Sequence, residues 1–148
     1  MTTRLSLLRP ALFPRPLVRR PLCSTMICAG FPSPADDHQE RTIDLNEELI
    51  GNEAATFYYR VIGESGRDNF VRDGDIAVVD RSLTPVSGDV VLAVIDGENC
   101  FKRLRIAGKQ VWLESANREY PDITITGECT LVIEGVVTHT IHKHRHAR

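Results

Sequence analysis

Glycine-containing turn signals separate a series of short apolar runs, and this spacing constrains the fold more than any other feature of the sequence. Asp73-Gly74, Ser87-Gly88 and Asp96-Gly97 follow one another at intervals of ~9–14 residues. Asp96-Gly97 is the strongest hairpin signal, because Asp-Gly suits the tight turn that joins two antiparallel strands. The sequence therefore predicts a compact, mainly β domain.

The apolar runs between these turns have the length and the branched or aromatic composition of strands. We expect strands over residues 56–62, 76–79, 90–95, 100–106, 110–113 and 130–141. One short helix is expected at 46–50, with Asn46 or Asp44 as its N-cap and Gly51 at its end.

Residues 1–40 have the composition of an arm rather than of a packed domain. Residues 1–35 contain five arginines and no acidic residue, and prolines recur throughout. An arginine-rich, acid-poor segment is also typical of a mitochondrial transit peptide, but the prolines would break the amphipathic helix that such a peptide needs. We therefore favour a flexible N-terminal arm over a targeting signal.

Charge and cysteine content exclude several functions. From Gly30 onward, 13 basic residues face 20 acidic ones, a poor balance for holding DNA through its phosphates. The four cysteines form no CxxC pair, so the usual zinc and thioredoxin signatures are absent, and we expect reduced thiols. No apolar run approaches the ~20 residues that span a bilayer.

Lys102 is the first candidate for chemistry. On a strand over 100–106, Cys100, Lys102, Leu104 and Ile106 share one face. A lysine at a strand edge often reaches solvent with its charged end. Among apolar neighbours, however, burial disfavours the charged ammonium, which would leave a neutral amine that can accept a proton near neutral pH.

Ser65 is a matching candidate nucleophile. It lies in Gly63-Glu64-Ser65-Gly66, where the flanking glycines permit a sharp turn with backbone N–H groups close to the hydroxyl. A serine between glycines is often no more than a turn residue. A serine hydroxyl needs a base to remove its proton, and lysine serves as that base in some hydrolases.

Ala29-Gly30 is a pair of small residues that precedes an extended, proline-rich segment. Small side chains allow a backbone to lie close to a nucleophile. This pair has no meaning alone, but it occurs in order with the serine and the lysine.

These features together resemble the UmuD family of bacterial SOS mutagenesis. The resemblance is carried by residues 29–36 and 41–46, Gly63-Glu64-Ser65, Asp73-Gly74-Asp75, and 94–98 leading to Lys102-Arg103-Leu104. It extends from about residue 29 to 141, and the interval of 37 residues from Ser65 to Lys102 fits the family. One departure is Gly66, where the family usually has methionine, and a second is Ala29, where UmuD proteins often have cysteine.

The resemblance implies a mainly β fold with LexA- or signal-peptidase-like coiled sheets, one short helix and a flexible arm. It implies self-cleavage between Ala29 and Gly30, with Ser65 as nucleophile and Lys102 as base, and no cofactor. It divides the chain into an arm over 1–29, a linker over 30–40 and a protease domain over 41–148.

The same resemblance implies a cytoplasmic bacterial homodimer that is stimulated by the RecA–single-stranded-DNA filament. The shortened form would join a UmuC-type translesion polymerase, without binding a DNA sequence itself and without a membrane. An alternative is a non-catalytic binding module of the same fold, which Gly66 makes conceivable.

The C-terminal tail contains four of the five histidines. On a strand, His142, His144 and His146 would share a face, and imidazole is a good metal ligand. The adjacent sequence offers no carboxylate or cysteine, so we interpret the tail as solvated and predict no metal site.

Overall fold

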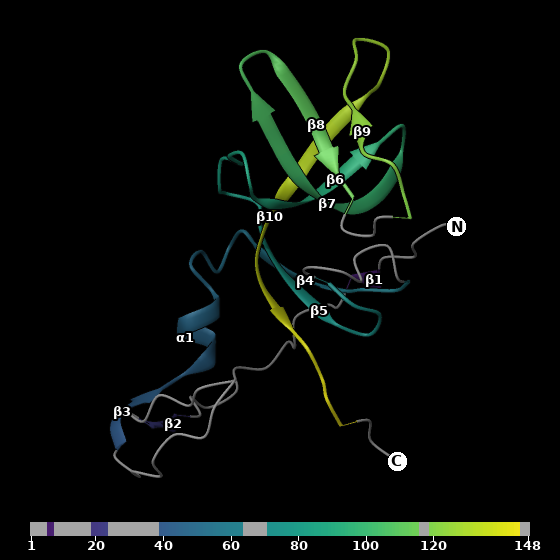
Figure 1. Cartoon of the computed structure of the whole chain (residues 1–148). Helices are drawn as coiled ribbons and strands as arrows, with labels where there is room; N and C mark the ends of the chain where they lie inside the picture. The colour runs from purple at the N-terminus through teal and green to yellow at the C-terminus, as the bar shows by residue number, and fades with distance from the viewer. Residues whose placement is uncertain (1–5, 8–18, 24–38, 64–70, 116–118, 146–148) are drawn as a thin grey trace, which may run out of the picture. The chain divides into compact units, whose positions relative to one another are not determined.

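A computed structural model describes residues 6–7, 19–23, 39–63, 71–115 and 119–145. The chain forms two compact units, one of residues 11–49 and one of residues 1–10 with 50–148. We describe each by itself, using the strand and helix labels of Figure 1.

The smaller unit contains a two-stranded sheet and the helix. Strands β2 (Arg20–Cys23) and β3 (Gln39–Ile43) pair antiparallel. Helix α1 (Leu45–Leu49) follows, and the carboxylate of Asp44 accepts a hydrogen bond of 2.7 Å from the N–H of Asn46. Asp44 is therefore the N-cap, which decides between the two residues that the sequence left open. Strands β2 and β3 were not predicted from the sequence.

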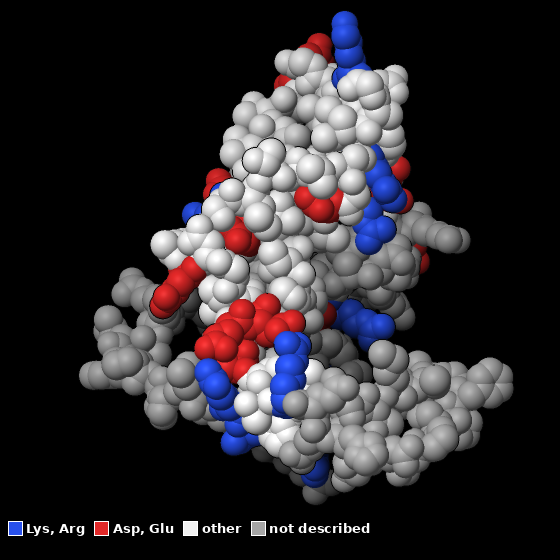
Figure 2. Space-filling model, turned by 90° about the vertical axis from the view of Figure 1, so that its left-hand side faces the viewer, with Lys and Arg blue, Asp and Glu red and all other residues white. Residues whose placement is uncertain are grey.

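Acidic and basic side chains are interspersed on the described part of the face shown in Figure 2. The smaller unit includes one ion pair of this kind, with Arg19 Nη2 3.8 Å from Glu47 Oε1. Both side chains are more than half exposed, so this pair contributes little to stability.

The larger unit is built on one eight-stranded sheet, with the strand order β1-β4-β5-β10-β6-β7-β8-β9. Figure 1 shows β10 running through the middle of this sheet, between β5 and β6. The strands are β1 (Ser6–Leu7), β4 (Thr56–Arg60), β5 (Ile76–Asp80), β6 (Val90–Ile95), β7 (Glu98–Ala107), β8 (Gln110–Glu114), β9 (Ile123–Thr124) and β10 (Leu131–Ile141).

The six expected strands are confirmed as β4 to β8 and β10, with small shifts at their ends. The Asp96-Gly97 turn joins β6 to β7 with positive φ angles of 49° and 86°, and Ile95 pairs with Glu98. These angles are those of the two-residue hairpin turn that Asp-Gly favours. The mainly β fold with one short helix is thus confirmed, and no described helix is long and apolar enough to cross a membrane.

The two faces of β6 and β7 pack into different hydrophobic clusters, because successive side chains of a strand point to opposite faces. Leu92 and Phe101 belong to a cluster with residues of β4 and β5. Val91 and Leu104 belong to a second cluster, which includes Leu113 of β8. Lys102 pairs with Val91 in the ladder and therefore lies on the face of the second cluster.

Candidate active site

Lys102 lies on β7, where it pairs with Val91 of β6, and is 7% exposed. Its face of β7 also carries Leu104, which is fully buried, and Cys100, which packs against the second cluster. The predicted placement of this lysine among apolar neighbours is confirmed. Removing an ammonium group from water costs free energy unless hydrogen bonds replace those of the solvent.

The Lys102 amine donates a hydrogen bond of 2.9 Å to the hydroxyl oxygen of Ser115. Ser115 follows the end of β8, and its own N–H donates a bond of 3.0 Å to Asp122 Oδ1. Lys102 and Ser115 face each other across the β7–β8 hairpin, since Arg103 pairs with Glu114. The hydroxyl thus replaces part of the lost hydration of the amine without adding a second charge.

Cys100 is the nearest thiol along the strand to this amine. Burial raises the pKa of the Cys100 thiol, while the positive charge of Lys102 acts to lower it and Glu98 to raise it further. A thiol with a raised pKa stays protonated near neutral pH and is a poor nucleophile. Cys100 therefore serves as an apolar neighbour of Lys102 rather than as a reactive group.

Hydrogen bonds hold together the two ends of the segment that contains Ser65. The N–H of Val61 donates to the carbonyl of Asp75, and the N–H of Gly74 donates back to the carbonyl of Val61, both at 2.9 Å. The N–H of Gly63 donates to Asp73 Oδ1 at 2.8 Å. Hydrogen bonds between residues 61–63 and 73–75 therefore join the two points at which the segment begins and ends.

Ser65 and Gly66 lie outside the described residues, between Gly63 and Val71. Ala29 and Gly30 also lie outside them, in a segment whose two ends are joined by the pairing of β2 with β3. The roles expected of Ser65 and of the Ala29-Gly30 bond therefore remain predictions.

The turn at Asp73-Gly74-Asp75 has a partner that the sequence did not indicate. Asp75 is 2% exposed, and His142 Nδ1 forms a short hydrogen bond with its Oδ1. The sequence next to the histidines has no carboxylate, but the fold brings one to His142 from a distant segment. The physical reason is that β10 pairs with β5 and brings His142, just beyond Ile141, next to the residue that precedes Ile76.

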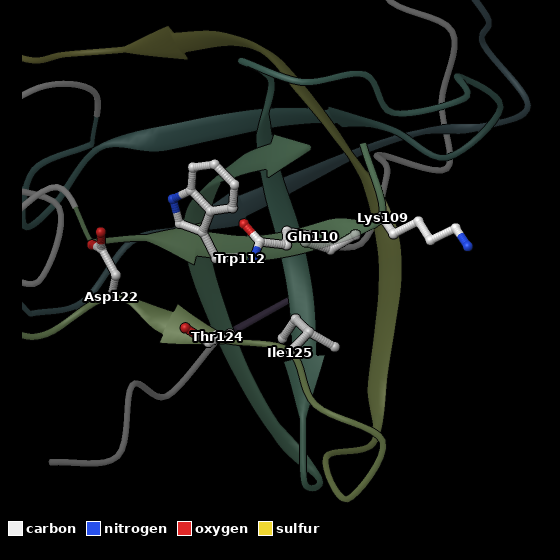
Figure 3. A pocket seen from close by; sticks show the side chains of 7 residues that line it. Lys109, Gln110, Trp112, Asp122, Thr124 and Ile125 are labelled. Carbon is white, nitrogen blue, oxygen red and sulfur yellow. The ribbon is translucent and has the colours of Figure 1, made fainter. Parts of the chain in front are cut away.

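A pocket of about 460 Å³ is lined by the β7–β8 turn, by β8 and by the segment around β9 (Figure 3). Figure 3 shows Gln110, Trp112 and Asp122 around it. Trp112 pairs with Arg105 in the ladder, so it points away from the face that carries Lys102 and Leu113. Among the described residues, Lys102 does not line the pocket, and Asp122 is shared between the pocket and the lysine network.

The fold and this network define a mainly β protein of the LexA-like class with a buried lysine on β7, between β6 and β8. The chain belongs to the Peptidase S24-like family, whose sequence model matches residues 21–138. It is thus a protein of serine-peptidase type from a family of self-cleaving proteins.

The chain is similar to several curated proteins over most of its length. It is 43% identical to protein ImpA of Escherichia coli over 129 residues, which are 87% of this chain and 88% of ImpA. It is 44% identical to protein SamA of Salmonella typhimurium over 125 residues, 84% of this chain and 86% of SamA. It is also 36% identical to the LexA repressor of Frankia alni over 115 residues, 74% of this chain and 45% of that repressor. The resemblance to UmuD-type proteins is therefore confirmed.

Two members of the network were missed from the sequence. Ser115 could have been found, because a two-residue turn at Gly108-Lys109 places residue 115 opposite residue 102 in the hairpin. His142 had no such signal, since 67 residues separate it from Asp75.

Proposed function

We propose that this chain cuts its own backbone between Ala29 and Gly30, with Ser65 as nucleophile and Lys102 as general base. The observation that supports the proposal most directly is the burial of Lys102, at 7% exposure, on a strand of a Peptidase S24-like domain. A lysine works as a base only as the neutral amine, and a buried amine can contact a serine hydroxyl without competing water.

The reaction proceeds in two steps. The Lys102 amine takes the proton from the Ser65 hydroxyl while the serine oxygen attacks the carbonyl carbon of Ala29. The backbone N–H of Ser65 donates to the negatively charged oxygen of the tetrahedral intermediate. The bond to Gly30 breaks, and the Lys102 ammonium passes its proton to the departing amine. Water, activated by the same amine, then hydrolyses the ester to release Ser65.

Attachment of the scissile bond to its own enzyme offsets the weakness of a serine nucleophile. The reaction is effectively intramolecular, so the free energy of bringing the two groups together is small. In this proposal residues 1–29 form the removed arm, residues 30–40 the linker and residues 41–148 the protease domain.

The proposed biological role follows from the likeness to ImpA and SamA. The intact form is a cytoplasmic bacterial homodimer stimulated by the RecA–single-stranded-DNA filament. The shortened form is an accessory subunit of a UmuC-type translesion polymerase. Neither form requires a cofactor, a membrane or sequence-specific DNA contacts of its own.

Replacement of Lys102 tests the proposal. Purified full-length protein is incubated at alkaline pH, and its intact mass is measured over time. Wild type should yield residues 30–148 as the product, beginning Gly30-Phe31-Pro32. No product is expected from Ser65→Ala, which lacks the nucleophile, or from Lys102→Ala, which lacks the base. Lys102→Arg should also give no product, because a guanidinium does not lose its proton in this pH range.

Lys109→Arg is the matched control, since Lys109 is exposed in the β7–β8 turn. It should cut at the wild-type rate, and circular dichroism should show that every variant is folded. Cleavage at Ala29-Gly30 by folded Lys102→Arg would refute the serine–lysine mechanism. A wild-type protein that stays intact, even with an activated RecA filament, would instead support the non-catalytic binding module.

A further inference from the structure

The contact between Lys102 and Ser115 is part of a chain of hydrogen bonds that ends at Asp122. Lys102 Nζ lies 2.9 Å from Ser115 Oγ, and the N–H of Ser115 lies 3.0 Å from Asp122 Oδ1. Asp122 comes just before β9, whose Ile123 pairs with Leu113 of β8. Two neighbouring segments of the sheet therefore hold the Ser115 backbone in place.

A lysine base needs such support because its side chain is long and flexible. Four rotatable bonds separate the amine from the backbone, and ordering them costs conformational entropy. The aliphatic part of Lys102 packs on an apolar face, which does not fix the direction of the amine. A single well-placed hydrogen bond at the amine can do so.

A hydroxyl is suited to this task in both protonation states of the amine. Its oxygen accepts a bond from the ammonium, and its rotating hydrogen can be donated to the lone pair of the neutral amine. A carboxylate in the same place would instead hold the lysine in its charged form. On the same face, Cys100 is the titratable neighbour, and burial raises the pKa of its thiol.

We propose that Ser115 is the positioning residue for Lys102, holding its amine at one place on the sheet through proton uptake and release. This inference rests on the proposed function of Lys102 as a base. Asp122 takes part only by fixing the Ser115 backbone, through its bond to the Ser115 N–H.

The first test compares Ser115→Ala with Ser115→Thr in the self-cleavage assay at alkaline pH. Ser115→Ala should lower the rate by about tenfold or more, since the amine gains a proton in the reaction and hydrogen bonds to charged groups are worth that factor. Ser115→Thr retains a hydroxyl and should recover most of the rate.

Ser87→Ala is the matched control. The Ser87 hydroxyl also bonds to β7, accepting from the N–H of Ile106 at 2.9 Å, but it does not contact Lys102. This variant should keep the rate of wild type. Wild-type cleavage by Ser115→Ala, or slow cleavage that threonine does not rescue, would overturn the positioning role.

A second readout does not depend on cleavage. In full-length Ser65→Ala protein, nuclear magnetic resonance relaxation measures the mobility of the carbon next to the Lys102 amine. Adding Ser115→Ala should increase this mobility, and unchanged relaxation would show that the contact is absent in solution. If Lys102→Ala still cuts itself, the proposed base is wrong, and the positioning role falls with it even where the contact is confirmed.

Discussion

Gly135→Ala should destabilise the protein, because β10 passes very close to β5 at this glycine. Gly135 lies at an irregularity of the β10–β6 pairing, between Ile133 and Val136. A methyl group there would lie 2.6 Å from Val79 Cγ1, 2.9 Å from the Asp80 carbonyl oxygen and 3.3 Å from Arg81 Cα. Two of these three neighbours are backbone atoms, so a side-chain rotation cannot remove the clash.

The cost follows from how little the surroundings can move. Val79 is fully buried and Asp80 is 5% exposed, and Asp80 pairs with both Thr56 and Val136. Relief therefore requires a shift of β5 within the sheet. Overpacking of this kind costs about 1–3 kcal/mol, and we expect about 2 kcal/mol for Gly135→Ala.

Urea unfolding followed by the fluorescence of Trp112, the single tryptophan, measures this cost. The Ser65→Ala background keeps the chain in one piece during the experiment. At a urea dependence typical of a domain of this size, a loss of about 2 kcal/mol lowers the midpoint by about 1 M. Circular dichroism before unfolding establishes that the variant has folded.

Gly127→Ala is the matched control for this experiment, since no atom lies within 4 Å of a methyl group built there. Its unfolding free energy should stay within about 0.5 kcal/mol of the parent protein. A Gly135→Ala midpoint equal to that of Gly127→Ala would refute the reasoning, because it would show that β10 and β5 separate without cost.

Three further predictions concern the cores and the tail. Burial raises the pKa of the Cys100 thiol. The contribution of the protonated thiol to the free energy of unfolding should therefore be complete below the ordinary thiol pKa of about 8.5 and should decline as the pH rises above that value. Native-state alkylation at pH 8, mapped by mass spectrometry, should accordingly be slower at Cys100 than at Cys129. His142→Ala should lower the unfolding free energy by about 1–3 kcal/mol, since buried Asp75 loses a partner; an unchanged urea midpoint would contradict this. Leu113→Ala, at a fully buried position, should cost about 2–5 kcal/mol in the same assay, and a loss under 1 kcal/mol would show a loosely packed core.

Local chemistry made much of the fold predictable. The Asp96-Gly97 turn could be placed because few dipeptides accept two consecutive positive φ angles, and the structure has them there. The helix could be placed because Asp44 can cap it, although the sequence could not choose between Asp44 and Asn46. Strand β9 was missed because its two residues are too few to show an alternating pattern.

The candidate site was partly predictable for the same reason. The period of a strand is two residues, so the sequence placed Lys102 on one face with Cys100 and Leu104, and the structure confirms it. The burial of that face could not follow from periodicity, because an alternating strand shows which residues share a face and not what covers it.

The sequence by itself determined the class of fold and the hairpin turns, because each depends on neighbours a few positions away. The candidate residues Ser65, Lys102 and Ala29-Gly30 came from the resemblance to the UmuD family. Only the tertiary structure decided that β10 lies between β5 and β6. That order brings His142 to Asp75. It also places Gly135 of β10 against Val79 and Asp80 of β5. The bond from Ser115 to Asp122 likewise needed the pairing of β8 with β9. Contacts of this kind depend on which strands pair across long stretches of chain, and strand periodicity carries no information about the partner.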